Sequence, residues 1–170
     1  GAEGNPAVSP DGRFLAYAAT AGIRKGYNGA ELVIKDFKTG ETRTLTDTLD
    51  RSIADIQWSD NSKRIWIGYD DLGVGRAAEV DLNGKLRKAE IVIGGTAIGR
   101  PYTSGAFSVA GDARLAFTQG RDDRPADIAV FRPGKAPLQL TDLNSDLMGQ
   151  RQMARVERLV WPSSHDELMI

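Results

Sequence analysis

The feature that most constrains this chain is an internal repeat with a spacing of 50 residues. Two apolar positions recur three times, as Leu15, Ile65 and Leu115 and as Tyr17, Ile67 and Phe117. Each pair stands in the second of two strand-like runs that are joined by a polar or Gly-containing turn, within residues 7–20, 56–70 and 106–119. Self-similarity at a fixed period indicates one supersecondary unit that is repeated along the chain.

A second pair of predicted strands follows each copy, within residues 30–47, 76–93 and 126–142. The turns inside these pairs are Lys38-Thr39-Gly40-Glu41, Asn83-Gly84 and Pro133-Gly134. Such turn sequences between alternating apolar runs are typical of hairpins. The tripeptide Leu-Thr-Asp ends the first and third units, at 45–47 and 140–142. Each unit therefore reads as a four-stranded antiparallel meander.

A small four-stranded sheet cannot bury both of its faces alone, so each unit needs a similar neighbour stacked on it. Radial stacking of four-stranded sheets is the β-propeller. We therefore predict an all-β fold, a partial β-propeller of three blades at about residues 5–50, 52–95 and 104–142. The alternative, a β-sandwich with three accidental look-alikes, is disfavoured because two positions recur at the same spacing.

The blades occupy residues 1–150 and an exit segment occupies 151–170 in this prediction. Propellers usually have about four to eight blades, so three blades do not close a ring. We expect open sheet faces at both ends, and such faces favour a partner.

Composition narrows the classes of partner. The chain has 22 Lys and Arg against 23 Asp and Glu, a formal net charge of -1, which argues against a nucleic-acid partner. The longest nearly apolar run, residues 14–23, is about half of what a membrane span needs, and no leader peptide is visible. The absence of Cys excludes disulfides and thiolate sites, and it fits cytoplasm and periplasm equally.

No catalytic residue is predicted. A serine-hydrolase nucleophile sits in a G-x-S-x-G elbow, and this pentapeptide does not occur. The one His, His165, neighbours Ser163, Ser164 and Asp166, but sequence adjacency does not make a triad, because successive strand side chains point to opposite faces.

No cofactor or metal is predicted either. Residues 73–78, Gly-Val-Gly-Arg-Ala-Ala, match a relaxed dinucleotide fingerprint, but a strand follows them where the fingerprint requires a helix. Residues 142–146, Asp-Leu-Asn-Ser-Asp, lack the Gly and the distal Glu of a calcium loop. A single His disfavours a His-rich zinc site.

The stretch after the third unit, residues 137–170, resembles the propeller exit of the prolyl oligopeptidase family of serine peptidases. The similarity is greatest to the acylaminoacyl-peptidase and dipeptidyl-peptidase-like branches, where a phrase like QLTxLN is followed by E…xxWxSxDGxxIxGW. The matching residues are Gln139, Leu140, Thr141, Leu143, Asn144, Glu157, Trp161, Ser164, Asp166 and Ile170. Glu167 departs from the pattern, because the family usually has Gly there.

The resemblance implies a non-catalytic propeller that caps an α/β-hydrolase domain and admits short peptides. That domain, beyond Ile170, would supply the Ser nucleophile, the His base and the Asp. In such a propeller Arg76, Arg100 and Tyr102, which fall near inter-strand connections, are candidates for gating peptide substrates. An Arg there could pair bidentately with a peptide carboxylate, and a solvated surface Arg is the alternative.

Expected partners are therefore the hydrolase domain, the remaining blades and a peptide, with a second copy of this chain as a further possibility. The competing interpretation is a protein-interaction module of a translocation- or scaffold-type protein. A propeller lyase or glycosidase would need channel-facing carboxylate pairs or metal-ligating His residues, which this sequence hardly offers.

Overall fold

The computed structural model describes residues 2–20, 22, 28–95, 105–111, 113–157 and 159–165. These residues form three four-stranded sheets and one short helix, α1 (Ser145–Met148). The first sheet contains β1 (Ala2–Val8), β2 (Phe14–Thr20), β3 (Glu31–Asp36) and β4 (Thr42–Thr44). The second contains β5 (Ile53–Trp58), β6 (Arg64–Asp71), β7 (Val74–Asp81) and β8 (Leu86–Lys88). The third contains β9 (Phe107–Val109), β10 (Leu115–Gln119), β11 (Asp127–Phe131) and β12 (Leu138–Gln139).

Every sheet is an antiparallel meander in which the spatial order of the strands follows the chain. The predicted hairpin turns lie between these strands, and the residues that need a left-handed backbone are placed accordingly. Gly12, in the first turn, has φ 72°, and Gly84 has φ 83°. The predicted all-β fold and its meanders are confirmed.

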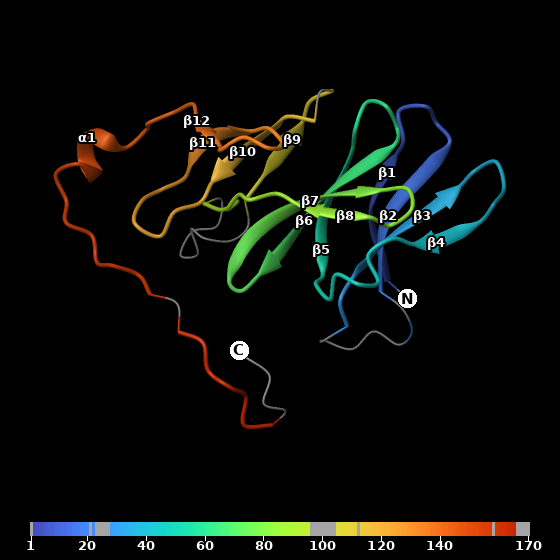
Figure 1. The fold of residues 1–170 in the computed structure, drawn as a ribbon, viewed down its shortest axis with the longest axis horizontal. Coiled ribbons are helices and arrows are strands. Elements are labelled where there is room, and N and C mark those ends of the chain that lie inside the picture. Colours follow the sequence, from blue (N-terminus) through green and yellow to red (C-terminus); the bar gives the residue numbers. More distant parts are fainter. Residues whose placement is uncertain are drawn as a thin grey trace.

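The three sheets stack face to face, with the second sheet between the first and the third (Figure 1). Strand β6 shows why both faces of the second sheet are apolar. Ile65, Ile67 and Tyr69 pack against the first sheet, whereas Trp66, which points the other way, packs against the third. The middle sheet is thus buried on both sides, as expected for a blade with two neighbours.

The 50-residue repeat has a direct structural meaning. Leu115 and Phe117 face the second sheet and are buried, as Ile65 and Ile67 are against the first sheet. Leu15 and Tyr17 occupy the same place in the first sheet but are only half-buried. Equivalent positions therefore point toward the preceding blade, and the first sheet has none before it in the described chain. This layering is that of propeller blades.

A short segment after β8 ties the second and third sheets together. Ile93 forms a bridge with Gly75 of β7 and another with Gln119 of β10. Its N–H donates to the Gly75 carbonyl at 2.9 Å. A Cβ at Gly75 would overlap the Ile93 carbonyl, so the close approach of the two backbones requires Gly at this position.

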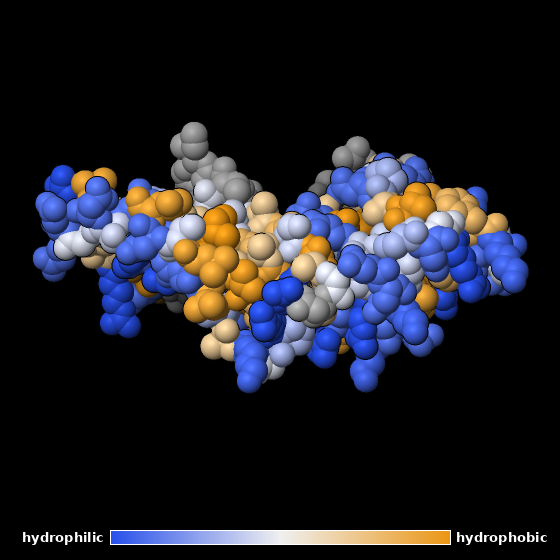
Figure 2. Space-filling view, turned by 90° about the horizontal axis from the view of Figure 1, so that it is seen from above, coloured by the Kyte–Doolittle hydropathy of each residue, from blue (hydrophilic) through white to orange (hydrophobic). Residues whose placement is uncertain are grey.

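Among the described residues, no core cluster covers the outer face of the first sheet or that of the third sheet. Figure 2 shows apolar groups gathered mainly left of the centre of the molecule, with a smaller patch toward its right side. On the third sheet, Ile128 is 38% exposed and Leu138 is 65% exposed. In the described part of the chain, no helix has the length and apolar character of a membrane span.

Candidate functional site

The first strands of the three sheets, β1, β5 and β9, form a linked edge, which we call the channel-side edge. The Trp58 indole N–H donates to the Ala7 carbonyl at 2.9 Å. The Gln57 amide donates to the Phe107 carbonyl at 2.7 Å and accepts from the Val109 N–H at 3.2 Å. The blades of a propeller surround a central channel, and we assign this linked edge to the side that would face it.

Arg76 lies on β7, where it is half-buried, in a small cleft beside this edge. The cleft has a volume of about 120 Å³ and is also lined by Asp55, Tyr69 and Asp70. One guanidinium nitrogen of Arg76 donates to the Ile91 carbonyl at 3.0 Å. This carbonyl is a neutral acceptor, and the carboxylates of the cleft, Asp55 and Asp70, are the nearby groups of opposite charge.

Tyr69 also lines the cleft. Burial raises the pKa of its hydroxyl above the usual 10.0, and the nearby Asp71 carboxylate acts in the same direction. Tyr69 therefore keeps its proton at neutral pH, although its ring packs in the core between the first two sheets.

The cleft brings together residues that sequence reasoning did not combine. Arg76, which was predicted near an inter-strand connection, is the third residue of β7. Arg100 and Tyr102 lie outside the described residues, so their role stays a prediction. Asp55 on β5 and Asp70 on β6 were not predicted, because no spacing in the sequence shows that neighbouring strands place them beside Arg76.

This arrangement can bind charged groups but contains no nucleophile–base pair. Its lining combines two carboxylates, which suit a cation, with the Arg76 guanidinium, which suits an anion. The backbone N–H of His165 donates to Ser163 Oγ at 3.2 Å, a contact that does not involve the imidazole. The described residues hold no group of three His, Asp or Glu side chains arranged to bind a metal.

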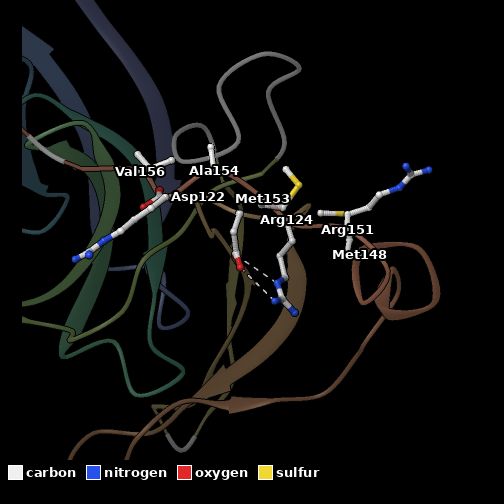
Figure 3. Close-up of a pocket in the computed structure, with 9 residues that line it drawn as sticks. Asp122, Arg124, Met148, Arg151, Met153, Ala154 and Val156 are labelled. Atoms are coloured by element: carbon white, nitrogen blue, oxygen red, sulfur yellow. Dashed lines mark hydrogen bonds and ion pairs between the residues drawn. The ribbon is translucent and has the colours of Figure 1, made fainter.

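A second cleft lies where the chain leaves the third sheet, between residues 122–124 and 148–156, with a volume of about 440 Å³ (Figure 3). Arg124 pairs with the Asp123 carboxylate at 3.2 Å. This contact lowers the pKa of Asp123 and raises that of Arg124. Figure 3 shows Arg151 extending away from this pair. The second cleft thus contains the Asp123–Arg124 ion pair and a further cation, Arg151, which forms no ion pair among the described residues.

The described part of the exit segment, residues 151–157 and 159–165, runs away from the sheets as an extended chain (Figure 1). Several large apolar side chains there are exposed, among them Leu159 at 74% and Trp161 at 55%. A run of exposed apolar side chains beyond a folded sheet is typical of a segment that packs against a further surface.

These features define part of a β-propeller, and comparison with known proteins agrees. No protein-family model and no curated protein sequence matches the chain. Solved structures do match. The β-propeller domain of the Trilobed protease from Pyrococcus furiosus has a TM-score of 0.60 at 13% identity, over 82% of this chain and 43% of that one.

A puromycin-hydrolyzing peptidase from Mycobacterium tuberculosis matches with a TM-score of 0.59 at 24% identity, over 81% of this chain and 22% of that one. TolB from Acinetobacter baumannii matches with a TM-score of 0.59 at 17% identity, over 83% of this chain and 32% of that one. Acylaminoacyl peptidases are also among the matching structures. At these identities the similarity establishes the fold, and the chain spans less than half of each of these proteins.

Proposed function

We propose that this chain is the non-catalytic propeller segment of a prolyl-oligopeptidase-family serine peptidase. In this proposal the blades limit access of peptides to an active site that other residues of the parent protein carry. Three blades in propeller order, together with matches to the structures of several peptidases, support it. Domain boundaries at about residues 150 and 151 are part of the proposal.

The observation that carries the proposal is the exit segment. It follows the last strand of the third sheet, it matches the family's exit phrase at Glu157, Trp161 and Ser164, and its apolar side chains are exposed. A hydrolase domain packed beside the third sheet would cover these side chains. The second cleft, with its Asp123–Arg124 pair, would then lie at the junction.

The channel-side edge supplies the proposed gate. Arg76 and the two carboxylates Asp55 and Asp70 would select short peptides by the charges of their ends. The side-chain links of Gln57 and Trp58 fix the spacing between neighbouring blades, so a folded protein would not widen the entrance easily.

The activity test compares the 170-residue chain with its full-length parent. The chain should not hydrolyse an aminoacyl p-nitroanilide, whereas the parent should, and a fluorophosphonate should label a serine beyond Ile170 in a G-x-S-x-G sequence. Turnover by the 170-residue chain that a fluorophosphonate blocks would contradict the proposal.

The gating test uses Arg76→Gln in the parent protein. We expect a KM increase of about tenfold for a short peptide with a free carboxylate and little change for its amide, because only the carboxylate needs the guanidinium. Arg132→Gln, on an exposed turn of the third sheet, is the matched control. Equal KM values of the two variants for the peptide with a free carboxylate would show that Arg76 is not part of the gate.

The open faces of the first and third sheets belong to the same proposal. The remaining blades of the parent would cover them, and a second copy of this chain would do so in isolation. We expect light scattering to detect association of the isolated chain, and Tyr17→Lys on the open first face to weaken it. A monomer at all concentrations would oppose this part of the proposal.

A second candidate is a protein-interaction module of the translocation or scaffold type, which the match to TolB favours. It predicts no fluorophosphonate-reactive serine in the parent protein. It also predicts that the parent binds a partner protein through the blades. The labelling experiment therefore separates the two candidates.

A further inference from the structure

We propose that a cleft between the outer parts of the second and third sheets binds an apolar carboxylate, such as the carboxyl-terminal residue of a peptide. The outer cleft has a volume of about 510 Å³ and lies between residues 87–90, at the end of β8, and residues 133–137, between β11 and β12. Strand β8 is at the opposite edge of the second sheet from β5. The outer cleft is therefore separate from the channel-side edge, and this inference does not depend on the proposed gate.

The outer cleft has an aromatic floor. Trp66 and Phe131, both in the core between the second and third sheets, line it, together with Ala89, Pro133 and Pro137. Volumes of several hundred Å³ with mainly apolar walls are typical of sites for small organic groups. An aromatic or branched aliphatic side chain fits such a lining.

The floor also holds an unpaired donor. Trp66 is 1% exposed, and its indole N–H has no hydrogen-bond partner in the described structure. Burying a donor without an acceptor is costly, so a ligand that enters deeply enough to bring an acceptor oxygen to this buried N–H would gain a hydrogen bond without breaking another within the protein.

Positive charge surrounds the apolar floor. Arg87, Lys88 and Lys135 line the outer cleft, against one acidic side chain, Glu90. Among the described residues neither Lys88 nor Lys135 forms an ion pair with a carboxylate. This excess of cations favours an anionic ligand, and a carboxylate is the anion that peptides carry.

A buried carboxylate holds Arg87 in place. Glu79, which is 1% exposed and lies directly opposite Trp66 in the sheet, accepts hydrogen bonds from Arg87 and, at 3.0 Å, from Arg64. Both guanidinium groups bind its Oε2 and offset its charge, whereas its buried Oε1 has no hydrogen-bond partner in the described structure. Arg87 therefore presents a fixed cation next to the aromatic floor.

The ligand class follows from these three features together. A carboxyl-terminal Phe or Leu residue offers an apolar side chain for the floor and a carboxylate for the cations. The carbonyl of the preceding residue, or of an N-acetyl group, offers an acceptor for the Trp66 N–H. A purely apolar ligand would leave the cations unused, and an inorganic anion would leave the floor uncovered.

The test is calorimetric titration of the 170-residue chain with N-acetylphenylalanine and with its uncharged amide. We expect saturable binding of the carboxylate and about tenfold weaker binding of the amide, because the amide lacks the charge. Absence of saturable binding, or equal affinity for the two compounds, would overturn the proposal.

Variants locate the binding. The double variant Lys88→Gln, Lys135→Gln should lower affinity for the carboxylate about tenfold and leave the amide unchanged. Lys63→Gln, an exposed lysine in the β5–β6 turn, is the matched control and should bind like the unchanged chain. An equal loss in the control would show binding elsewhere and contradict the proposal.

Trp66→Phe tests the unpaired donor, because it keeps a ring on the floor and removes the N–H. This variant should bind both compounds more weakly. Far-ultraviolet circular dichroism checks that its sheets remain folded. The lysine variants, which lie on the surface, keep the proposal testable if this core variant does not fold.

A tripeptide ending in Phe distinguishes the two sources of the ligand. Tighter binding than that of N-acetylphenylalanine assigns the outer cleft to peptide termini, and equal binding assigns it to small carboxylates.

Discussion

At the residue scale, a recurring tripeptide explains how the fourth strand of a blade is fastened. In Leu-Thr-Asp at 45–47, the Thr46 hydroxyl accepts the Leu32 N–H at 2.8 Å and lies 3.2 Å from the Glu31 carboxylate. In the copy at 140–142, the Thr141 hydroxyl accepts the Ile128 N–H at 2.8 Å and donates to Asp127 at 2.9 Å. In both blades, therefore, the Thr hydroxyl of this tripeptide accepts a backbone N–H of the third strand.

Thr46→Val should therefore lower the free energy of unfolding by about 1–3 kcal/mol, because the isosteric change leaves the buried Leu32 N–H without an acceptor. Urea unfolding measures the difference. Thr44→Val, on the exposed strand β4, is the control and should change little. Equal effects of the two changes would show that the hydroxyl does not matter.

Acid stability is a second residue-scale property. The Arg13 guanidinium beside Asp36, at 2.8 Å, holds the pKa of that carboxyl below its ordinary value of 3.8. The folded protein therefore binds a proton at Asp36 less readily than the unfolded chain does. Its contribution to stability is present above 3.8 and is lost as the pH falls through the lower folded pKa.

We expect the free energy of unfolding to decrease between about pH 5 and about pH 2, and Asp36→Asn to make this decrease shallower. Urea unfolding at several pH values measures the slope. Asp47→Asn is the control, because exposed Asp47 forms no ion pair among the described residues. An unchanged slope in Asp36→Asn would count against the Arg13 contact as the cause.

At the element scale, the first turn of each blade sets the register of its strands. In the first blade the Ser9 N–H donates to the Phe14 carbonyl, and in the second the Ser59 N–H donates to the Arg64 carbonyl. The two turns are also joined, because the Asp11 N–H donates to Ser62 Oγ at 3.0 Å. A local turn motif thus contributes to the contact between blades.

Gly12→Ala should destabilise the protein by about 1–2 kcal/mol, because φ of 72° is left-handed and costs an L-residue strain. Nothing lies within 4 Å of a Cβ at Gly12, so backbone strain is the only cause. Gly4→Ala is the matched control, with equally free space and no left-handed φ. Thermal unfolding of both variants measures the difference. Equal shifts of the unfolding temperature would show that backbone strain at Gly12 is not the cause.

At the scale of the whole molecule, the open ends make equivalent residues unequal. Leu15 and Leu115 hold the same place in the repeat, yet Leu115 is 0% exposed between two sheets and Leu15 faces an uncovered side. Burial, and with it the contribution to stability, depends on the neighbouring blade and not on the residue.

Leu115→Ala should cost about 2–5 kcal/mol, because it leaves a cavity between two sheets. Leu15→Ala should cost less than about 1 kcal/mol in the isolated chain, because much of that side chain is already in water. Urea unfolding of the two variants measures both values. Similar losses would mean that the first face is covered in solution, which light scattering would then show as association.

Much of the fold could be predicted from the sequence because its signals are local. Alternating apolar residues, turn sequences such as Asn83-Gly84 and the 50-residue spacing act over one hairpin or one blade. The candidate site could be predicted from the sequence less completely than the fold. Arg76 was predicted, but Asp55, Asp70 and the Gln57 link were not, because their roles depend on strands that meet only after folding.

The sequence by itself determined that three similar meanders form, and which side of each faces the preceding blade, since strand alternation and turn conformation are local properties of the chain. Tertiary structure alone decided which of the equivalent positions are buried, and that Trp66 with its free N–H meets the cations of the outer cleft. The physical reason is that burial and electrostatic contact depend on distances between sheets, and no spacing along the chain specifies those distances.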